Sequence, residues 1–293
     1  MDKATVIGGS GFLGSHVVDE LTRRGVEVTV FDRIPSPWIR DNQSMRVGDM
    51  LDGEALASAC DGARYLYHFG GIADIGEAQA RPFATIKTNV LGVATALEAA
   101  QTSGVERFLY ASTMYVYSAA GSFYRASKQA AETIIEAYAE HFDLGYTLLR
   151  YGSLYGPRAQ AWNGLRRYVR QVVKEGRLDY AGSGQERREY IHVRDAARLS
   201  VDVLDEQHRN QAITVTGTQV LDSTDLAEMI FEIAGKKSNV VFSEEERSEE
   251  HYRMTPYRYT PHPAKKMVPS EFIDLGQGIL EVVEEIHQAN DDG

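Results

Sequence analysis

The sequence predicts an α/β fold, a doubly wound parallel sheet with a smaller mixed α/β C-terminal substrate domain. Strand-like apolar segments alternate with helical ones from residue 5 to about residue 151. The first strand ends in a glycine-rich turn that opens a helix, Gly8-Gly9-Ser10-Gly11. The alternation stops near Gly156-Pro157, where an irregular basic stretch begins. Because strand–helix alternation gives a parallel sheet with helices on both faces, we expect the first half to form one such sheet.

The composition limits the partners and the location of the protein. The chain has 293 residues, a formal net charge of −11 and a sequence pI near 5.3. Nucleic acids and anionic membranes need a basic face, so we expect neither as a partner. A single cysteine, Cys60, excludes an intrachain disulfide and is interpreted as a core residue. We find no bilayer-spanning apolar run and no signal-peptide pattern, so we expect a cytoplasmic protein. Separately, we predict no metal site.

A strand, a glycine turn, a helix and a second strand open the chain. Thr5–Ile7 is the first strand, and residues 26–32 are the second. Between them, Gly8, Gly11 and Gly14 have the spacing G-x-x-G-x-x-G. The first two glycines let the backbone turn and approach a pyrophosphate, and the third lets the helix pack on the strand. The helix N-terminus presents N–H groups to the phosphates, so this unit predicts a Rossmann-type dinucleotide site.

The end of the second strand favours NAD over NADP. Asp32 lies there, and its carboxylate can accept both hydroxyls of an adenine ribose while repelling a 2′-phosphate. Arg33 follows directly, and an adjacent arginine can accommodate that phosphate. NADP therefore stays open as the less favoured cofactor.

The next segments continue the alternation up to residue 151. A long helix begins at Pro82 and ends before Gly104, and Asn89 lies within its apolar pattern. His68 ends a strand, where we expect it to pack near a cofactor rather than act as a base. The expected segments are a short strand and turn in 45–52, strands 64–69, 107–111 and 147–151, and helices 52–60, 82–103 and 124–141.

A tyrosine and a lysine four residues apart point to proton transfer. Tyr124 and Lys128 share one face of a helix. We expect the cation of Lys128 to lower the pKa of Tyr124, so that a phenolate can take a proton from an alcohol. Ser112 and Thr113 end a strand, where ligands of such sheets bind. Their hydroxyls could hold a substrate oxygen or cap the following turn. If Tyr124 is not the base, Tyr117 is the alternative base.

Arginines are frequent between residues 157 and 190. Those between residues 166 and 170 fit a solvated helix face. Arg187 and Arg188 instead lie beside a strand-like segment, where a phosphate contact is favoured because the arginine fork matches phosphate oxygens.

The change of pattern at residue 156 sets the predicted domain boundaries. We assign residues 1–156 to the NAD-binding domain, with a strand and helix returning to it at about 193–235. We assign residues 157–192 and 236–293 to a substrate-binding domain. The segments expected in this half are helices 195–204, 223–235 and 279–286, a strand at 212–215, a charged run at 244–250 and a loop at 252–269.

Ten short motifs occur in order along nearly the whole chain. They are Gly8-x-x-Gly11-x-x-Gly14, Asp32, Gly48-Asp49-x-x-Asp52, His68-Phe69-Gly70-Gly71, Asn89-Val90-x-Gly92, Ser112-Thr113-x-x-Val116-Tyr117, Tyr124-x-x-x-Lys128, Leu149-Arg150-Tyr151, Tyr155-Gly156-Pro157-Arg158 and Arg188-Glu189-Tyr190-Ile191-His192-Val193-x-Asp195. Together they resemble the extended short-chain dehydrogenase/reductase family, in its nucleotide-sugar epimerase/dehydratase branch. The joint order carries the resemblance, because each motif alone is weak.

The resemblance implies a role for each site residue. Tyr124 would be the base and acid, Lys128 would bind the nicotinamide ribose, and Thr113 would hold the substrate oxygen. Asp49 would contact the adenine ring, and Arg188 would bind the substrate diphosphate. Ser112 and Ser153 are further implied substrate residues. The other implied cofactor residues are Phe12, Leu13, Met50, Phe69, Gly70, Gly71, Asn89, Ala111 and Tyr151.

Departures from the family pattern narrow the implied reaction. Dehydrating members have Thr-Asp-Glu before Val-Tyr, but Met114 and Tyr115 stand here, so a 4,6-dehydratase is disfavoured. What remains is an NAD-dependent epimerase of a nucleotide-diphosphate sugar at C4, through transient oxidation to a 4-keto sugar. The alternatives are an NAD(P)-dependent dehydrogenase or ketoreductase, and a dinucleotide-sensing regulator without chemistry. Ser153 and the short loop 118–123 leave the sugar and its nucleotide open.

The resemblance also implies a homodimer. Related enzymes pair through two long helices, which here are those near 84–103 and 125–142. Core burial explains the same apolar stripes, so both interpretations stand.

Overall fold

The computed structural model describes residues 2–218, 220–243 and 251–256. The charged run 244–250 and the helix expected at 279–286 lie outside the described residues, as does most of the loop expected at 252–269. The part of the predicted substrate domain beyond residue 256 is therefore not described.

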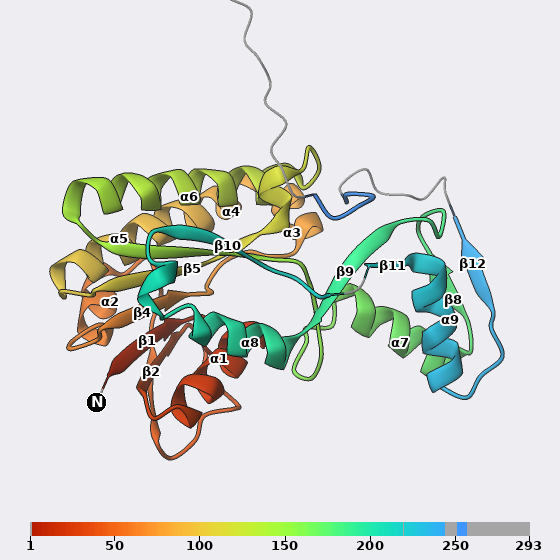
Figure 1. The fold of residues 1–293 in the computed structure, drawn as a ribbon, viewed down its shortest axis with the longest axis horizontal. Coiled ribbons are helices and arrows are strands. Elements are labelled where there is room, and N and C mark those ends of the chain that lie inside the picture. Colours follow the sequence, from red (N-terminus) through yellow and green to blue (C-terminus); the bar gives the residue numbers. More distant parts are fainter. Residues whose placement is uncertain (1, 219, 244–250, 257–293) are drawn as a thin grey trace, which may run out of the picture. The chain divides into compact units, whose positions relative to one another are not determined.

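A seven-stranded parallel sheet lies at the centre of the described chain, in the order β10-β6-β5-β4-β1-β2-β3 (Figure 1). Its five inner strands are largely buried, as expected for a parallel sheet that is covered on both faces, whereas the edge strands are more exposed. The predicted doubly wound α/β fold is confirmed. The strands are β1 (Lys3–Ile7), β2 (Glu27–Asp32), β3 (Gln43–Val47), β4 (Tyr65–His68), β5 (Arg107–Thr113), β6 (Gly145–Tyr151) and β10 (Gln211–Val215).

Helices cover both faces of this sheet, and each face has its own apolar core. On one face, α1 (Phe12–Arg23) packs against α8 (Val193–Asp202), as Figure 1 shows below the sheet. On the other face lie α2 (Gly53–Ala59), α5 (Gly92–Thr102) and α6 (Ser122–Phe142). The carboxyl ends of β1, β4 and β5 open towards one edge, where ligands of such sheets bind.

The helix expected over residues 82–103 is interrupted in the structure. It consists of α4 (Pro82–Ile86), a π-helical turn (Lys87–Leu91) and α5. Asn89 lies in this turn and is 1% exposed. The wider turn lets its side chain reach out of the helix, and π turns often occur at functional sites.

A smaller group of elements follows the change of pattern near residue 156. It contains a three-stranded sheet in the order β11-β9-β7 and a two-stranded sheet of β12 and β8. Its apolar core joins α7, α9 and β8. These elements are β7 (Ser153–Tyr155), α7 (Gly164–Glu175), β8 (Leu178–Tyr180), β9 (Arg187–His192), β11 (Val220–Asp222), α9 (Ser223–Ile233) and β12 (Val240–Phe242). Short helices complete the described chain, α3 (Ile75–Ala80) and the 3-10 turns Met114–Tyr117 and Glu206–His208.

The segment expected to return to the large sheet, 193–235, divides between the two groups. α8 packs on α1, and β10 pairs with β6 in the large sheet. β11 instead pairs with β9, and α9 packs against α7. α9 belongs to the smaller group because its apolar residues pack into one core with residues of α7 and β8.

Two further observations concern membranes and metals. Among the described residues, no helix combines the length and apolarity needed to cross a bilayer. The same residues contain no group of three or more His, Cys, Asp or Glu side chains arranged to hold a metal ion.

Candidate active site

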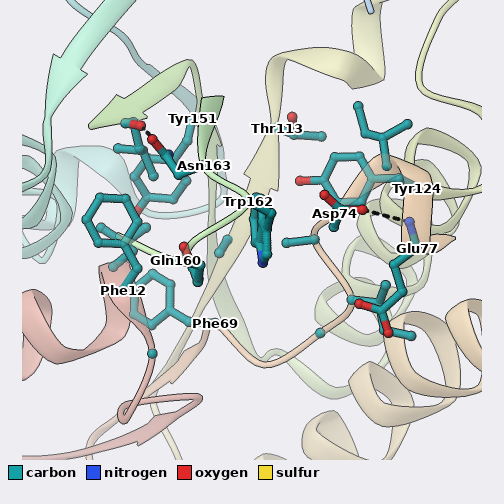
Figure 2. A pocket seen from close by; sticks show the side chains of 18 of the residues that line it. Phe12, Phe69, Asp74, Glu77, Thr113, Tyr124, Tyr151, Gln160, Trp162 and Asn163 are labelled. Carbon is teal, nitrogen blue, oxygen red and sulfur yellow. Dashed lines mark hydrogen bonds between the residues drawn. The ribbon is translucent and has the colours of Figure 1, made fainter. Parts of the chain in front are cut away.

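A cavity of about 950 Å³ lies at the carboxyl edge of the large sheet and extends to the smaller group of elements. Of the residues predicted from the sequence to bind cofactor or substrate or to act in catalysis, all but Asn89, Arg187 and Tyr117 line this cavity. Those residues are Gly8, Gly11, Phe12, Leu13, Gly14, Asp32, Arg33, Asp49, Met50, Phe69, Gly70, Gly71, Ala111, Ser112, Thr113, Tyr124, Lys128, Tyr151, Ser153 and Arg188. In Figure 2 the ring of Tyr124 points its hydroxyl towards the middle of the cavity, while Phe12, Phe69 and Tyr151 lie on the other side.

The turn between β1 and α1 leaves room for a phosphate only because it contains glycine. Gly8 has a φ of +78°, which favours glycine, and its carbonyl oxygen accepts from the N–H of Gly11 at 3.1 Å. A Cβ on Gly14 would lie 2.3 Å from that same oxygen. The turn therefore fits the pyrophosphate of a dinucleotide at the N-terminus of α1.

Asp32 is held in place at the end of β2. Its Oδ2 accepts from the backbone N–H of Ser10 at 3.0 Å, which ties the carboxylate to the glycine turn. The Ser10 hydroxyl donates to the carbonyl of Ile34 at 2.9 Å. This arrangement fixes a carboxylate where the adenine ribose of NAD would lie, so the residues present fit that cofactor.

Asn89 holds the wall of the cavity from behind. Its Oδ1 accepts from the N–H of Ile72 at 2.8 Å, and its Nδ2 donates to the carbonyl of Ile72 and to the hydroxyl of Ser127. A Cβ on Gly71 would approach its Oδ1 to 2.9 Å. In this structure Asn89 therefore positions the segment at 71–72 against α6 and does not itself line the cavity.

Thr113, Tyr124 and Lys128 come together in the cavity. Thr113 ends β5, and its hydroxyl makes a hydrogen bond with Tyr124 in the first turn of α6. Lys128 follows one turn later, and its ammonium donates to the carbonyl of Ala111 at 2.7 Å. The same ammonium lies 4.6 Å from the ring centre of Tyr110 and 5.9 Å from that of Tyr124.

The pKa of Tyr124 moves in the opposite direction to the one expected from spacing alone. Burial raises the pKa of Tyr124 to about 12, and the hydrogen bond with Thr113 offsets only part of this effect. Burial also lowers the pKa of Lys128 to about 8, although Glu132 acts against this shift. Desolvation disfavours both charged forms, and in the unliganded protein it outweighs the attraction between them.

Ser112 lines the cavity, but its hydroxyl already has a partner. It donates to Oε1 of Glu132 at 2.5 Å, and the same carboxylate pairs with Arg150 at 2.6 Å. Arg150 in turn donates to the hydroxyl of Tyr117 and lies over its ring. Since this network occupies Tyr117 and the residue does not line the cavity, the structure gives no support to Tyr117 as a reserve base.

His68 and Cys60 have the packing roles expected of them. His68 is fully buried, with Phe108 and Tyr110 rings about 6 Å away, and burial lowers its pKa to about 3. Cys60 is also fully buried, and burial raises its pKa to about 12.

The cavity also contains residues that the sequence analysis missed, some of them around the predicted Arg188. Arg188 on β9 lines it, and its guanidinium lies 5.4 Å from the ring centre of Tyr252. Tyr252 makes hydrogen bonds with Ser153 and Thr255. Further lining residues that were not predicted are Asp74, Glu77, Arg81, Tyr115, Gln160, Trp162, Asn163, Arg167, Tyr168, Tyr180, Glu186 and His251, of which Asp74, Glu77, Gln160, Trp162 and Asn163 are labelled in Figure 2. No local spacing in the sequence marks them, because they reach the cavity through the fold.

Comparison with known proteins assigns the family. Residues 4–216 match the model of the NAD dependent epimerase/dehydratase family. The chain belongs to this family. It is therefore an enzyme, its cofactor is NAD, and the resemblance inferred from the motifs is confirmed.

Relatives within the family differ in their reactions. The chain is 29% identical to a UDP-glucose 4-epimerase of Erwinia amylovora, over 68% of this chain and 72% of the relative. It is 28% identical to a dTDP-glucose 4,6-dehydratase of Streptomyces antibioticus, over 80% and 78%. A crystal structure of the Thermotoga maritima UDP-glucose 4-epimerase with UDP-glucose superposes with a TM-score of 0.79, at 25% identity, over 88% of this chain and 90% of that one.

Proposed function

We propose that the protein is an NAD-dependent nucleotide-sugar epimerase that inverts C4 through a transient 4-keto sugar. One observation carries the proposal. Thr113, Tyr124 and Lys128 line the same cavity as the glycine turn at one end and Arg188 at the other. A hydride carrier, a proton acceptor and a diphosphate can thus meet in one space.

Each of these residues has a separate role in the oxidation step. Tyr124 takes the proton of the sugar 4-hydroxyl, and Thr113 shares a hydrogen bond with the same oxygen. Lys128 is the cation beside Tyr124, and its charge favours the phenolate when that proton moves. Arg188 binds the diphosphate and so keeps the attached sugar in position for the reaction. Bound in the turn, NAD supplies the acceptor for the C4 hydride and its source on return. Tyr124 then gives its proton back to the inverted alkoxide.

Sequence relatives support a UDP-hexose as the substrate. The Erwinia amylovora and Thermotoga maritima relatives are UDP-glucose 4-epimerases. The dehydratase relative is less informative about the reaction, because Met114 and Tyr115 replace the acid pair implied for dehydration.

A panel of substrates tests the proposal directly. NAD-loaded protein is incubated with UDP-activated hexoses, hexosamines and uronic acids, and the sugar ring protons are followed by NMR. An epimerase converts one 4-epimer into the other with no net change in nicotinamide absorbance. Net reduction of NAD would favour the dehydrogenase or ketoreductase alternative. Binding of NAD without turnover of any sugar in the panel would contradict the proposed substrate class.

Removing one hydroxyl tests the role of Tyr124. Tyr124→Phe should lower kcat about a hundred- to ten-thousandfold while NAD still binds, because general-base help of this size is lost. Tyr65→Phe, which removes a hydroxyl outside the cavity, is the matched control. If Tyr124→Phe kept more than about a tenth of the wild-type kcat, Tyr124 would not be the base.

We also propose a homodimer in the cytoplasm. Large apolar side chains are exposed on or next to the helices near 84–103 and 125–142, namely Phe83, Ile86, Leu91, Phe123 and Phe142. Burial of these side chains against a second copy would remove apolar area from water. A monomeric mass at micromolar concentration, measured by light scattering, would contradict the dimer.

A further inference from the structure

Two side chains that the proposed oxidation does not use meet in the cavity. The hydroxyl of Tyr115 lies 2.6 Å from Nδ1 of His251, although 136 residues separate them in the sequence. Both line the cavity that holds Tyr124. A phenol hydrogen-bonded to an imidazole can pass a proton in either direction.

Tyr115 is held directly beside the catalytic group. Its backbone N–H donates to the hydroxyl oxygen of Thr113 at 3.2 Å. Its ring meets the ring of Tyr124 edge-on, with centroids 6.0 Å apart. Gly121 has a φ of +98°, and a Cβ there would come within 2.7 Å of the Tyr115 ring. The phenol is therefore packed closely on the first turn of α6.

His251 is placed by the contacts of its own segment, 251–256. The carbonyl of Arg253 accepts from the N–H of Arg187 on β9 at 2.7 Å. The hydroxyl of Thr255 accepts from the N–H of Glu189 at 3.3 Å. The ring of Tyr252 packs on the ring of Tyr115, with centroids 4.5 Å apart. These contacts fix the segment to the small sheet and carry His251 to the cavity.

The electrostatic surroundings keep His251 neutral and open to exchange with solvent. Partial burial, then Arg188 and Arg167, lower the pKa of His251 to about 4, and Asp74 opposes them. As a whole residue His251 is nevertheless exposed, so a proton that it receives can leave to water. A diphosphate bound at Arg188 would offset one of these cations, which raises the basicity of His251 when substrate is present.

We propose that Tyr115 and His251 form a second proton-transfer pair, which acts on a carbon next to the oxidised C4. In this step a C–H bond next to the ketone breaks. Its proton goes to the Tyr115 oxygen while the Tyr115 proton passes to Nδ1 of His251. The electron pair moves into an enolate, whose oxygen accepts hydrogen bonds from Tyr124 and Thr113. Return of the proton restores the ketone, so no oxidant or reductant is consumed.

The inference rests on the proposed 4-keto sugar, but its test does not require the enzyme to make that ketone. The protein loaded with NAD is incubated in D₂O with UDP-glucose in one arm and UDP-4-keto-6-deoxyglucose in the other. Deuterium at C3 and C5 is read by NMR and mass spectrometry against an enzyme-free control. A 4-epimerase without the second pair returns the same hydride to C4, so C3 and C5 both keep their original hydrogen and take up no deuterium.

Two variants separate proton transfer from packing. Tyr115→Phe keeps the ring contacts with Tyr124 and Tyr252 and removes only the hydroxyl. His251→Asn offers an acceptor near the place of Nδ1 but cannot take up a proton. Each should lower the exchange rate of the keto sugar by at least about a hundredfold, whereas a merely anchoring role predicts that His251→Asn exchanges like the wild type.

The outcomes distinguish this inference from the proposed function. Deuterium at C3 or C5 in the keto arm, lost in both variants, supports the pair even if UDP-glucose does not turn over. Inversion of UDP-glucose at C4 without deuterium in either arm would overturn the pair and leave the epimerase intact. Absence of both inversion and exchange would overturn both.

Discussion

Replacing Lys128 with methionine should stabilise the unliganded protein at pH 7 while removing its activity. The side chain is 6% exposed, and burial lowers its pKa from an ordinary 10.5 to about 8. At about 1.4 kcal/mol per pKa unit, the buried ammonium destabilises the fold by about 3 kcal/mol at pH 7. Methionine leaves the carbonyl of Ala111 without this donor, which costs about 1 kcal/mol. The free energy of unfolding should therefore rise by about 2 kcal/mol.

The pH dependence of stability gives the same test a second readout. Between about pH 8 and 10 the unfolded chain binds a proton at Lys128 that the folded chain has lost. The free energy of unfolding of the wild type should therefore rise with pH relative to that of Lys128→Met. Comparing the two proteins cancels the opposite contribution of Cys60, whose pKa is raised to about 12.

The assay is urea unfolding of nucleotide-free protein, followed by circular dichroism at several pH values. Lys236→Met is the matched control, because this exposed lysine also donates to a backbone carbonyl, that of Val173, at 2.8 Å. The control should be neutral or slightly destabilised at every pH. A Lys128→Met protein that is less stable than wild type at pH 7, with the same pH dependence, would refute the reasoning.

Two other substitutions test the cofactor turn and the buried network. Gly14→Ala should abolish NAD binding in calorimetry, because the new Cβ would lie 2.3 Å from the Gly8 carbonyl oxygen. Gly53→Ala, where an added Cβ makes only an ordinary contact with Thr95 at 3.7 Å, should bind NAD normally. Glu132→Gln should lower the free energy of unfolding by about 3 kcal/mol, because Arg150 loses its partner in a largely buried ion pair; an unchanged urea midpoint would count against that role.

Sequence reasoning worked where the chemistry is local. The three glycines lie close together in one short segment, so their spacing alone indicates the turn that they form. Tyr124 and Lys128 lie one helical turn apart, so helix geometry places their side chains on the same face. Thr113 could be added because parallel strands present their carboxyl ends at one edge. These relations hold in any sheet of this type, and the structure brings the residues together in one cavity.

Two kinds of feature could not be read from the sequence. The contact between Tyr115 and His251 depends on how segment 251–256 docks on β9, and no spacing encodes this. The direction of the Tyr124 pKa depends on how much water the finished cavity excludes. Spacing shows the nearby cation but not the desolvation that outweighs it.

The pH dependence of kcat/KM tests how Tyr124 and Lys128 share their protons. With pKa values of about 12 and about 8, both groups are protonated at pH 7 in the unliganded protein. Loss of one proton gives either a phenol beside a neutral amine or a phenolate beside an ammonium ion. Both forms carry the same number of protons, so their ratio does not change with pH.

Only the form with a phenolate beside an ammonium ion can take the substrate proton. We therefore expect kcat/KM for UDP-glucose to rise about tenfold per pH unit up to about pH 8 and then to level off. The plateau should begin well below the pKa of Tyr124, because Lys128 supplies the proton that is lost. A rise that continued at the same slope above about pH 9 would mean that Tyr124 titrates independently of Lys128, and the two would not act as one unit.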